Sequence, residues 1–297
     1  MRILLTGKNG QLGFELSRSL APLGDIRAVD IAECNLADEQ SIRRLVQDLR
    51  PTIIVNPAAF TAVDKAENDS GAARAINADA PGILGEEAAK IGAWVVHYST
   101  DYVFDGRQRD AYRENDQANP LNIYGRTKYD GELALACANP RHLILRTSWV
   151  VGAHGNNFAK TVLRLAAERD TLSIVADQSG SPTSASLLAD VTAHIVRQYQ
   201  REGSQGFPYG TYHLAAAGET NWFEYARFVL TRAIDAGRSL KIQPADIRPI
   251  TTDEYPTAAR RPANSRLDTS LLRETFGLQL PHWQLGVDHI LQQVLHD

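Results

Sequence analysis

The chain has 297 residues, of which 43% are hydrophobic and 22% are charged, with a formal net charge of −4. This composition is typical of a globular protein with a large core, and the lack of a basic excess disfavours nucleic acid as a partner. No apolar run approaches the ~20 residues of a membrane span, so no membrane partner is expected. The first residues lack a secretory signal, and Cys34 and Cys137 are interpreted as reduced thiols, so we expect a cytoplasmic protein.

Short apolar runs and amphipathic segments alternate through the first half of the chain. Strands are predicted at 2–6, 25–30, 52–56, 93–100 and 142–148. Helices are predicted at 10–24, 38–50, 71–92 and 123–138, with a bend expected at Pro81 and Gly82. This alternation is typical of an α/β fold, a Rossmann-type doubly wound parallel sheet with helices on both faces.

The alternation ends near residue 150. Helices are predicted near 156–168, 184–200, 221–237 and 283–295, between segments rich in Gly, Pro, Ser and Asn, with a strand within 211–218. We interpret residues 1–150 as an NAD(P)-binding Rossmann domain. Residues 151–297 are expected to form a smaller, mostly helical substrate domain, with the chain crossing back to the sheet.

A glycine-rich loop separates the first predicted strand from the first predicted helix. The segment TGKNGQLG contains Gly7, Gly10 and Gly13 at a spacing of three. In this context Gly7 permits a tight turn, Gly10 lets a pyrophosphate approach the backbone, and Gly13 lets helix and strand pack closely. The N-terminus of the helix also favours phosphate. The loop therefore predicts a dinucleotide site.

Asp30 ends the second predicted strand, where a carboxylate accepts hydrogen bonds from the ribose hydroxyls of NADH. Lys8 and Arg27 lie near it in sequence and can offset its repulsion of the NADPH phosphate. The sequence leaves the choice between NADH and NADPH open.

The stretch NIYGRTKYDGE (122–132) places Lys128 four residues after Tyr124, on the same face of a helix. A free tyrosine has a pKa near 10, and a nearby lysine cation lowers that pKa towards the working range of an acid–base group. The spacing also occurs by chance on surface helices. Here it accompanies the glycine loop and a strand that ends at Thr100 and Asp101, where open α/β sheets bind ligands.

In this order the segments resemble the extended short-chain dehydrogenase/reductases. A more specific resemblance, to the dTDP-4-dehydrorhamnose reductase family, extends over nearly the whole chain. It is carried by NPAAFTAVDKAE (56–67), HYSTDYVFDG (97–106), PLNIYGRTK (120–128), RTSWV (146–150), GNNFAK (155–160), DQSGSPT (177–183) and RPANSRL (261–267). The resemblance implies NADPH- or NADH-dependent reduction of the 4-keto group of dTDP-4-dehydro-6-deoxy-L-mannose to dTDP-L-rhamnose, the last step of dTDP-rhamnose synthesis.

The resemblance also implies roles for individual residues. Tyr124 is the expected proton donor, Lys128 tunes it and holds the nicotinamide ribose, and Thr100 supplies the third catalytic side chain. The implied cofactor contacts are Gly7, Gly10, Gln11, Leu12, Gly13, Asp30, Asn35, Leu36, Ala58, Ala59, Phe60, Thr61, Tyr98, Tyr124 and Lys128. The implied substrate contacts are Thr100, Asp101, Trp149, Asn157 and Arg261.

Several of these residues have simpler interpretations. Trp149 also fits a core aromatic, Asn157 a helix cap, and Arg261 a surface ion pair. Position 102, which is acidic in related dehydratases, is Tyr102, and this favours simple reduction. Another nucleotide-sugar reductase or epimerase, and a non-catalytic NADP-binding regulatory subunit, remain the alternatives.

Some relatives dimerise through a magnesium ion held by glutamates. Glu15 occupies one such position, but Ser186 and Gln293 appear at the other two. We therefore expect no metal site, and a monomer or a homodimer without a metal bridge.

Overall fold

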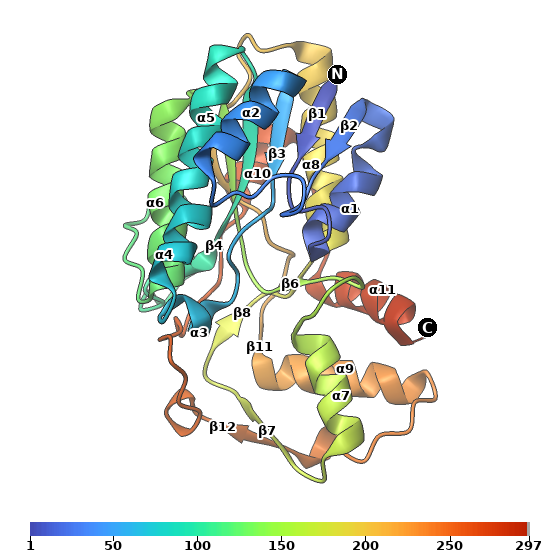
Figure 1. Cartoon of the computed structure of the whole chain (residues 1–297). Coiled ribbons are helices and arrows are strands. Elements are labelled where there is room, and N and C mark those ends of the chain that lie inside the picture. Colours follow the sequence, from blue (N-terminus) through green and yellow to red (C-terminus); the bar gives the residue numbers. More distant parts are fainter. Residues whose placement is uncertain (296–297) are drawn as a thin grey trace.

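The structure is a computed structural model that describes residues 1–295 (Figure 1). Its centre is a six-stranded sheet in the order β10-β5-β4-β3-β1-β2, in which every neighbouring pair is parallel. The strands are β1 (Arg2–Leu5), β2 (Asp25–Ala28), β3 (Ile53–Asn56), β4 (Trp94–Thr100), β5 (His142–Thr147) and β10 (Gly210–His213). The predicted α/β doubly wound fold is confirmed.

Helices cover both faces of this sheet. On one face lie α1 (Gln11–Ser19), α8 (Ala185–Glu202) and α10 (Ser270–Phe276), and on the other α2 (Glu39–Leu49), α5 (Ala80–Lys90) and α6 (Ile123–Ala138). Ile3 and Leu5 of β1 join the core on the α1 side, whereas Leu4 joins the core on the α2 side. Alternate residues of a strand point to opposite faces, so a fully apolar strand needs a cover on both.

The segment predicted as one helix at 71–92 consists of three parts. These are α4 (Ser70–Arg74), a π-helical turn (Ala75–Asp79) and α5, whose first turn contains Pro81. Proline is tolerated there because the first helical N–H groups need no partner within the helix. The helical region is therefore interrupted by the π turn and not at Pro81 and Gly82, where the sequence predicted the bend, because both of these residues lie inside α5. The short helix α3 (Val63–Ala66) precedes this region.

Residues beyond 150 contribute to both halves of the molecule. The strand predicted within 211–218 is β10, which pairs with β5, and α8 packs against α1. The remaining elements form a smaller layer beyond the carboxyl ends of the strands (Figure 1). They are β6 (Val150–Val151), α7 (Phe158–Glu168), β7 (Leu172–Val175), β8 (Ser179–Gly180), β9 (Thr183–Ser184), β11 (Thr220–Asn221), α9 (Trp222–Asp235), β12 (Ile247–Ile250) and α11 (Trp283–Leu295).

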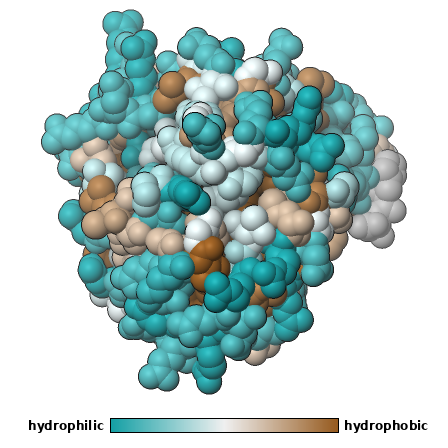
Figure 2. All heavy atoms as spheres, turned by 90° about the horizontal axis from the view of Figure 1, so that it is seen from above, coloured by the Kyte–Doolittle hydropathy of each residue, from teal (hydrophilic) through white to brown (hydrophobic). Residues whose placement is uncertain are grey.

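Two short strand pairs lie within this layer, separate from the six-stranded sheet. β6 pairs with β9, and β8 pairs with β11, so that residues near 150, 180 and 220 meet. A separate core fills the layer between α7, α9 and α11. The face seen from above in Figure 2 is mostly hydrophilic, with hydrophobic residues in small separate areas. Within residues 1–295 no helix is both long and apolar enough to cross a membrane.

Candidate active site

The glycine loop between β1 and α1 forms a tight cradle. Gly7 has φ 61°, a left-handed conformation that favours glycine. A Cβ atom on Gly13 would lie 1.9 Å from the carbonyl oxygen of Gly7, so only glycine fits. Gly10 precedes α1 and supplies no side-chain cap, which leaves the helix N-terminus available to an anion. The tight turn at Gly7 and the close packing at Gly13 agree with their predicted roles, whereas the approach of a pyrophosphate at Gly10 stays a prediction.

A cavity of about 230 Å³ adjoins the loop. Six of the predicted cofactor residues line it: Gly7, Asp30, Asn35, Leu36, Ala58 and Ala59. The remaining walls were missed by sequence reasoning and consist of Thr6, Val29, Ile31, Cys34 and Ile76. Ile31 follows Asp30 directly and Cys34 lies four residues after it, which is a usable signal, whereas Ile76 belongs to the π turn and has none. The mostly apolar walls suit a planar base.

The carboxylate of Asp30 is held by backbone N–H groups, from Asn9 at 2.9 Å and Ile31 at 2.8 Å. Lys8, which the sequence offered as a charge to offset Asp30, forms an ion pair with Glu33 instead. Glu33 also accepts the N–H of Asp30 at 2.9 Å. Lys8 is therefore paired with Glu33 and does not neutralise Asp30, so this end of the cavity keeps the negative charge of the Asp30 carboxylate.

Asn77, a residue that sequence reasoning missed, fixes the segment that follows β3. Its side chain accepts the N–H of Phe60 at 2.8 Å and donates to the Phe60 carbonyl at 3.1 Å. Asn77 is fully buried in the π turn and also lies 3.3 Å from the Thr127 hydroxyl of α6. Phe60 is half-buried, and Thr61 is exposed beside it.

Two glycines allow α6 to approach its neighbours closely, Gly125 the segment after β4 and Gly131 the π turn. A Cβ atom on Gly125 would lie 2.1 Å from the Tyr102 carbonyl oxygen, and one on Gly131 would lie 2.0 Å from the Asn77 carbonyl oxygen. Asn122 caps the helix by accepting the N–H of Gly125 at 2.7 Å. This close approach brings Tyr124, on the first turn of α6, to Thr100 at the end of β4.

Burial raises the pKa of Tyr124 to about 12, while a hydrogen bond with Thr100 acts in the opposite direction. Thr100 accepts the N–H of Tyr102 at 3.1 Å and donates to Asp101 at 3.0 Å. We expected the lysine cation to lower the pKa of Tyr124. The shift has the other sign, because desolvation of the phenolate dominates.

Lys128 is only 2% exposed. Its Nζ atom donates to the Tyr98 carbonyl at 2.6 Å and lies 3.2 Å from Nε2 of His97. Burial lowers the pKa of Lys128 to about 8, and the charge of Glu132 opposes that change. The Tyr98 side chain bonds to Thr192 of α8 at 2.6 Å, so Tyr98 reaches the site through its carbonyl rather than its ring.

Asp101 is 3% exposed, and its Oδ2 atom has no hydrogen-bond partner. Burial raises the pKa of this carboxyl group to about 7, against hydrogen bonds from Ser265 and Thr100. An unpaired buried carboxyl oxygen is costly in the free protein. It suits a site where a ligand hydroxyl completes the hydrogen bonding.

Trp149 is held in an unusual backbone conformation, with φ 49°. Its indole ring stacks on Trp222 with ring centroids 3.6 Å apart, and a Cβ atom on Gly180 would lie 2.6 Å from it. A strained non-glycine residue persists only where its surroundings hold it. Trp222 and Gly180 form that support, and sequence reasoning missed both.

With this geometry in place, comparison with known proteins gives the family. A family model described as the RmlD substrate binding domain matches residues 1–296. The chain belongs to the RmlD family. It is 48% identical to the dTDP-4-dehydrorhamnose reductase of Salmonella typhimurium and 47% identical to that of Escherichia coli K12, over 99% of this chain and 98% of each relative.

Solved structures agree. The dTDP-4-dehydrorhamnose reductase of Clostridium acetobutylicum has a TM-score of 0.90 and 33% identity, covering 98% of this chain and 99% of that one. The enzyme from Bacillus anthracis, solved in complex with NADP, has a TM-score of 0.89 and 36% identity with the same coverage. The RmlD family membership that the sequence motifs indicated is confirmed.

Two predicted substrate contacts of this RmlD family member are occupied by intramolecular bonds. Arg261 forms an ion pair with Asp64 at 2.7 Å. Asn157 caps α7 through the N–H of Lys160 at 3.1 Å and donates to Gln11 at 3.0 Å. The ion pair and the helix cap are the simpler interpretations that the sequence left open. A role in substrate binding stays a prediction for both residues.

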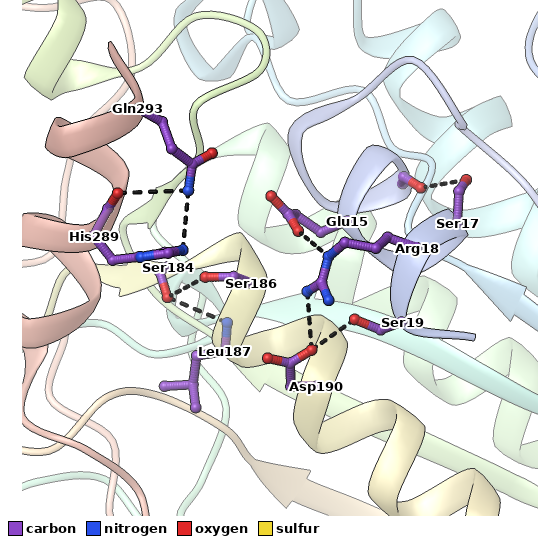
Figure 3. Close-up of polar contacts among 11 residues, drawn as sticks. Glu15, Ser17, Arg18, Ser19, Ser184, Ser186, Leu187, Asp190, His289 and Gln293 are labelled. Atoms are coloured by element: carbon purple, nitrogen blue, oxygen red, sulfur yellow. Dashed lines mark hydrogen bonds and ion pairs between the residues drawn. The ribbon is translucent and has the colours of Figure 1, made fainter. Parts of the chain in front are cut away.

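The three positions considered for a metal bridge have other partners (Figure 3). Glu15 pairs with Arg18 at 3.2 Å, Ser186 bonds to Ser184 at 3.1 Å, and Gln293 lies 3.0 Å from a ring nitrogen of His289. Among residues 1–295, no group of three or more His, Cys, Asp or Glu side chains is arranged to hold a metal ion. The oligomeric state stays a prediction.

Proposed function

We propose that the chain reduces dTDP-4-dehydro-6-deoxy-L-mannose to dTDP-L-rhamnose, with NADPH or NADH as the reductant. The observation that carries this function is the meeting of Thr100, Tyr124 and Lys128 at the end of β4, in a member of the RmlD family. Curated relatives that are 45–48% identical over nearly the full length are dTDP-4-dehydrorhamnose reductases.

The residues around the glycine loop fit a dinucleotide. The open N-terminus of α1 and the crowding at Gly13 suit a pyrophosphate lying against the backbone, and the adjoining cavity suits the adenosine part. The bound reduced nicotinamide supplies a hydride. We assign cofactor binding to residues 1–150, and we propose that residues 151–297 form a substrate domain that completes the sugar site together with Asp101 and Trp149.

Tyr124 donates the proton that the reduced carbonyl oxygen needs. Its raised pKa keeps the phenol protonated at neutral pH, which is the state that a proton donor requires. Thr100 orients the phenol and the sugar oxygen. The Lys128 ammonium stabilises the phenolate that remains after proton transfer.

The sugar-binding part of the site uses Asp101 and Trp149. The unpaired oxygen of Asp101 accepts a sugar hydroxyl, and the Trp149 indole offers a flat apolar surface to the sugar ring. Tyr102 packs edge-on against Tyr124, with ring centroids 5.6 Å apart. Position 102 therefore holds no carboxylate for an elimination, and this favours reduction over dehydration. We further propose that the protein acts in the cytoplasm, as a monomer or a homodimer without a metal bridge.

The test is a coupled assay with enzymatically prepared 4-keto nucleotide sugar and each cofactor. Tyr124→Phe is expected to lower turnover by about 10²-fold or more while cofactor binding persists. Tyr129→Phe removes a hydroxyl from the same helix and serves as the matched control, with turnover close to wild type. Full turnover by Tyr124→Phe would refute the assignment of the proton donor. A wild-type chain that binds cofactor but reduces no sugar would support the regulatory alternative.

A further inference from the structure

A row of buried polar side chains connects the glycine loop to Lys128 across three strands. Thr6 Oγ1 lies 2.6 Å from Asn56 Oδ1, and Asn56 Nδ2 lies 3.1 Å from His97 Nδ1. His97 Nε2 in turn lies 3.2 Å from Lys128 Nζ. All four residues are at most 2% exposed. The proposed reaction gives no role to Thr6, Asn56 or His97. Burying polar groups in the core costs free energy unless each one forms its hydrogen bonds, so the row calls for an explanation.

The hydrogen bonds of this row have a direction. The Thr6 hydroxyl donates to the Asn56 carbonyl oxygen, and the Asn56 amide nitrogen then donates to Nδ1 of His97. Burial and the neighbouring Lys128 lower the pKa of His97 well below its ordinary value, against a hydrogen bond with the Asn56 backbone, so the imidazole is neutral. A neutral ring that accepts at Nδ1 carries its proton on Nε2. That N–H faces Lys128.

Lys128 therefore lies between one acceptor and one donor. The Tyr98 carbonyl, at 2.6 Å, accepts a hydrogen bond from either form of the lysine. The His97 Nε2–H group can donate to an amine, because an amine has a lone pair, but it opposes an ammonium, which has none. The orientation of the hydrogen bonds in the row therefore favours the neutral amine form of Lys128 over its ammonium form.

Other charged groups near Lys128 act differently. On α6, the charge of Glu132 favours the ammonium, although its carboxylate is already bound to Arg146 of β5 at 2.7 Å. Also on α6, Tyr124 faces the site as a neutral phenol. Asp101 follows β4 with one unpaired oxygen. His97 differs from these neighbours because its two neutral tautomers have opposite effects on Lys128: Nε2–H disfavours the ammonium, whereas an unprotonated Nε2 accepts a hydrogen bond from it.

We propose that Thr6 and Asn56 are positioning residues that fix His97 in its Nε2–H tautomer and thereby weaken the ammonium form of Lys128. This inference rests on the proposed function for its catalytic meaning, but the tautomer and the charge exist in the free protein. The proton that distinguishes amine from ammonium is exchanged with solvent, and none has to travel along the row. With the row intact, Lys128 changes its charge close to the working pH.

The first test measures the free protein, without substrate. The ¹⁵N shifts of the His97 ring, assigned with His97→Gln, distinguish the two tautomers, and the ¹³Cε shift of Lys128 reports its titration. We expect the Nε2–H tautomer in the wild-type protein. Thr6→Val removes the first donor of the row, and it should raise the pKa of Lys128 by about half a unit or more. Thr6→Ser keeps the hydroxyl and should restore the wild-type titration.

Two further variants separate this effect from a loss of packing. Asn56→Asp presents only acceptors to His97, so it should switch the ring to the Nδ1–H tautomer and raise the pKa of Lys128 further. Thr192→Val is the matched control. The buried Thr192 hydroxyl of α8 bonds at 2.6 Å to Tyr98 of β4, the strand that also carries His97, but it lies outside the row. This variant should leave the titration of Lys128 unchanged.

In the catalysed reaction, the pH profile of kcat should move with the Lys128 titration in Thr6→Val and stay in place in Thr192→Val. A wild-type Nδ1–H tautomer, or equal titrations in Thr6→Val and wild type, would overturn the inference. Because the NMR readouts need no turnover, a failure of the proposed reaction is distinguishable from a failure of the row.

Discussion

The indole rings of Trp149 and Trp222 lie face to face, with centroids 3.6 Å apart and planes inclined by 15°. Trp222 donates from its own Nε1 to Gln178 at 3.1 Å, and this hydrogen bond anchors its ring. Trp149 adopts a strained backbone conformation with positive φ in this stack. The pair is a rigid aromatic platform at the junction of the two layers, and its rigidity depends on Gly180.

Gly180→Ala should weaken substrate binding. The added Cβ atom would meet the Trp149 indole at 2.6 Å and displace the ring. We expect the KM for the nucleotide sugar to rise by about tenfold, which corresponds to roughly 1.4 kcal/mol, while cofactor affinity stays constant. Steady-state kinetics and a cofactor titration measure the two effects. Gly71→Ala, where a Cβ atom meets nothing within 4 Å, is the control. An unchanged KM in Gly180→Ala would contradict the role of Trp149.

Gly13 and Gly10 should respond differently to alanine. Gly13→Ala places Cβ 1.9 Å from the Gly7 oxygen and should destabilise the fold by about 1–3 kcal/mol. At Gly10 the backbone has φ −77°, which any residue adopts, and a Cβ atom would lie 3.3 Å from the Gly7 carbonyl oxygen, a tight contact that a shift of a few tenths of an ångström relieves. Gly10→Ala should leave stability almost unchanged but lower cofactor affinity by about tenfold or more, because the methyl group lies in the path of the pyrophosphate. Urea unfolding and cofactor fluorescence titration separate these outcomes. Equal stability losses would show that the glycines share one role.

Glu33→Gln should change the cofactor preference. The substitution frees Lys8 from its ion pair while an amide oxygen remains for the Asp30 N–H. The freed ammonium can then attract the extra phosphate of NADPH. We expect the ratio of kcat/KM for NADPH to that for NADH to rise by about threefold or more at low salt, and to fall back in high salt. Glu168→Gln, which breaks an exposed pair with Arg164 on α7, should leave the ratio unchanged.

Asp101 should make the stability of the protein depend on pH. Its pKa is raised to about 7 in the folded chain, whereas an unfolded aspartate has a pKa near 3.9. Between these values the folded chain binds the extra proton, so this contribution to stability is present at low pH and is lost as the pH rises through 7. Asp101→Asn removes that loss.

The difference in the free energy of unfolding between Asp101→Asn and wild type should therefore shift in favour of the variant's folded state by about 2–3 kcal/mol from pH 5 to pH 8. Denaturant unfolding at both pH values measures it. Asp48→Asn, at an exposed position on α2, should show no such difference. A constant difference between wild type and Asp101→Asn would mean that the carboxyl group is ionised normally in the folded chain.

Local patterns predicted most of the sheet. The strands at 2–6, 52–56, 93–100 and 142–148 are observed within two residues of their predicted ends, because buried parallel strands read as short apolar runs between turn residues. The helix at 71–92 was predicted as one element. The π turn within it was not, because it depends on packing of Asn77 against Phe60 and α6 rather than on periodicity.

The sequence by itself determined the order of the elements, the glycine loop and the pairing of Tyr124 with Lys128, because each depends on residues a few positions apart. The tertiary structure alone decided that β10 closes the sheet beside β5, that Trp222 supports Trp149, and that His97 faces Lys128. These contacts join residues 31 to 73 positions apart, and no local periodicity encodes them. The charges at the site follow the same division: burial, which only the fold creates, raises the pKa of Tyr124 and lowers that of Lys128.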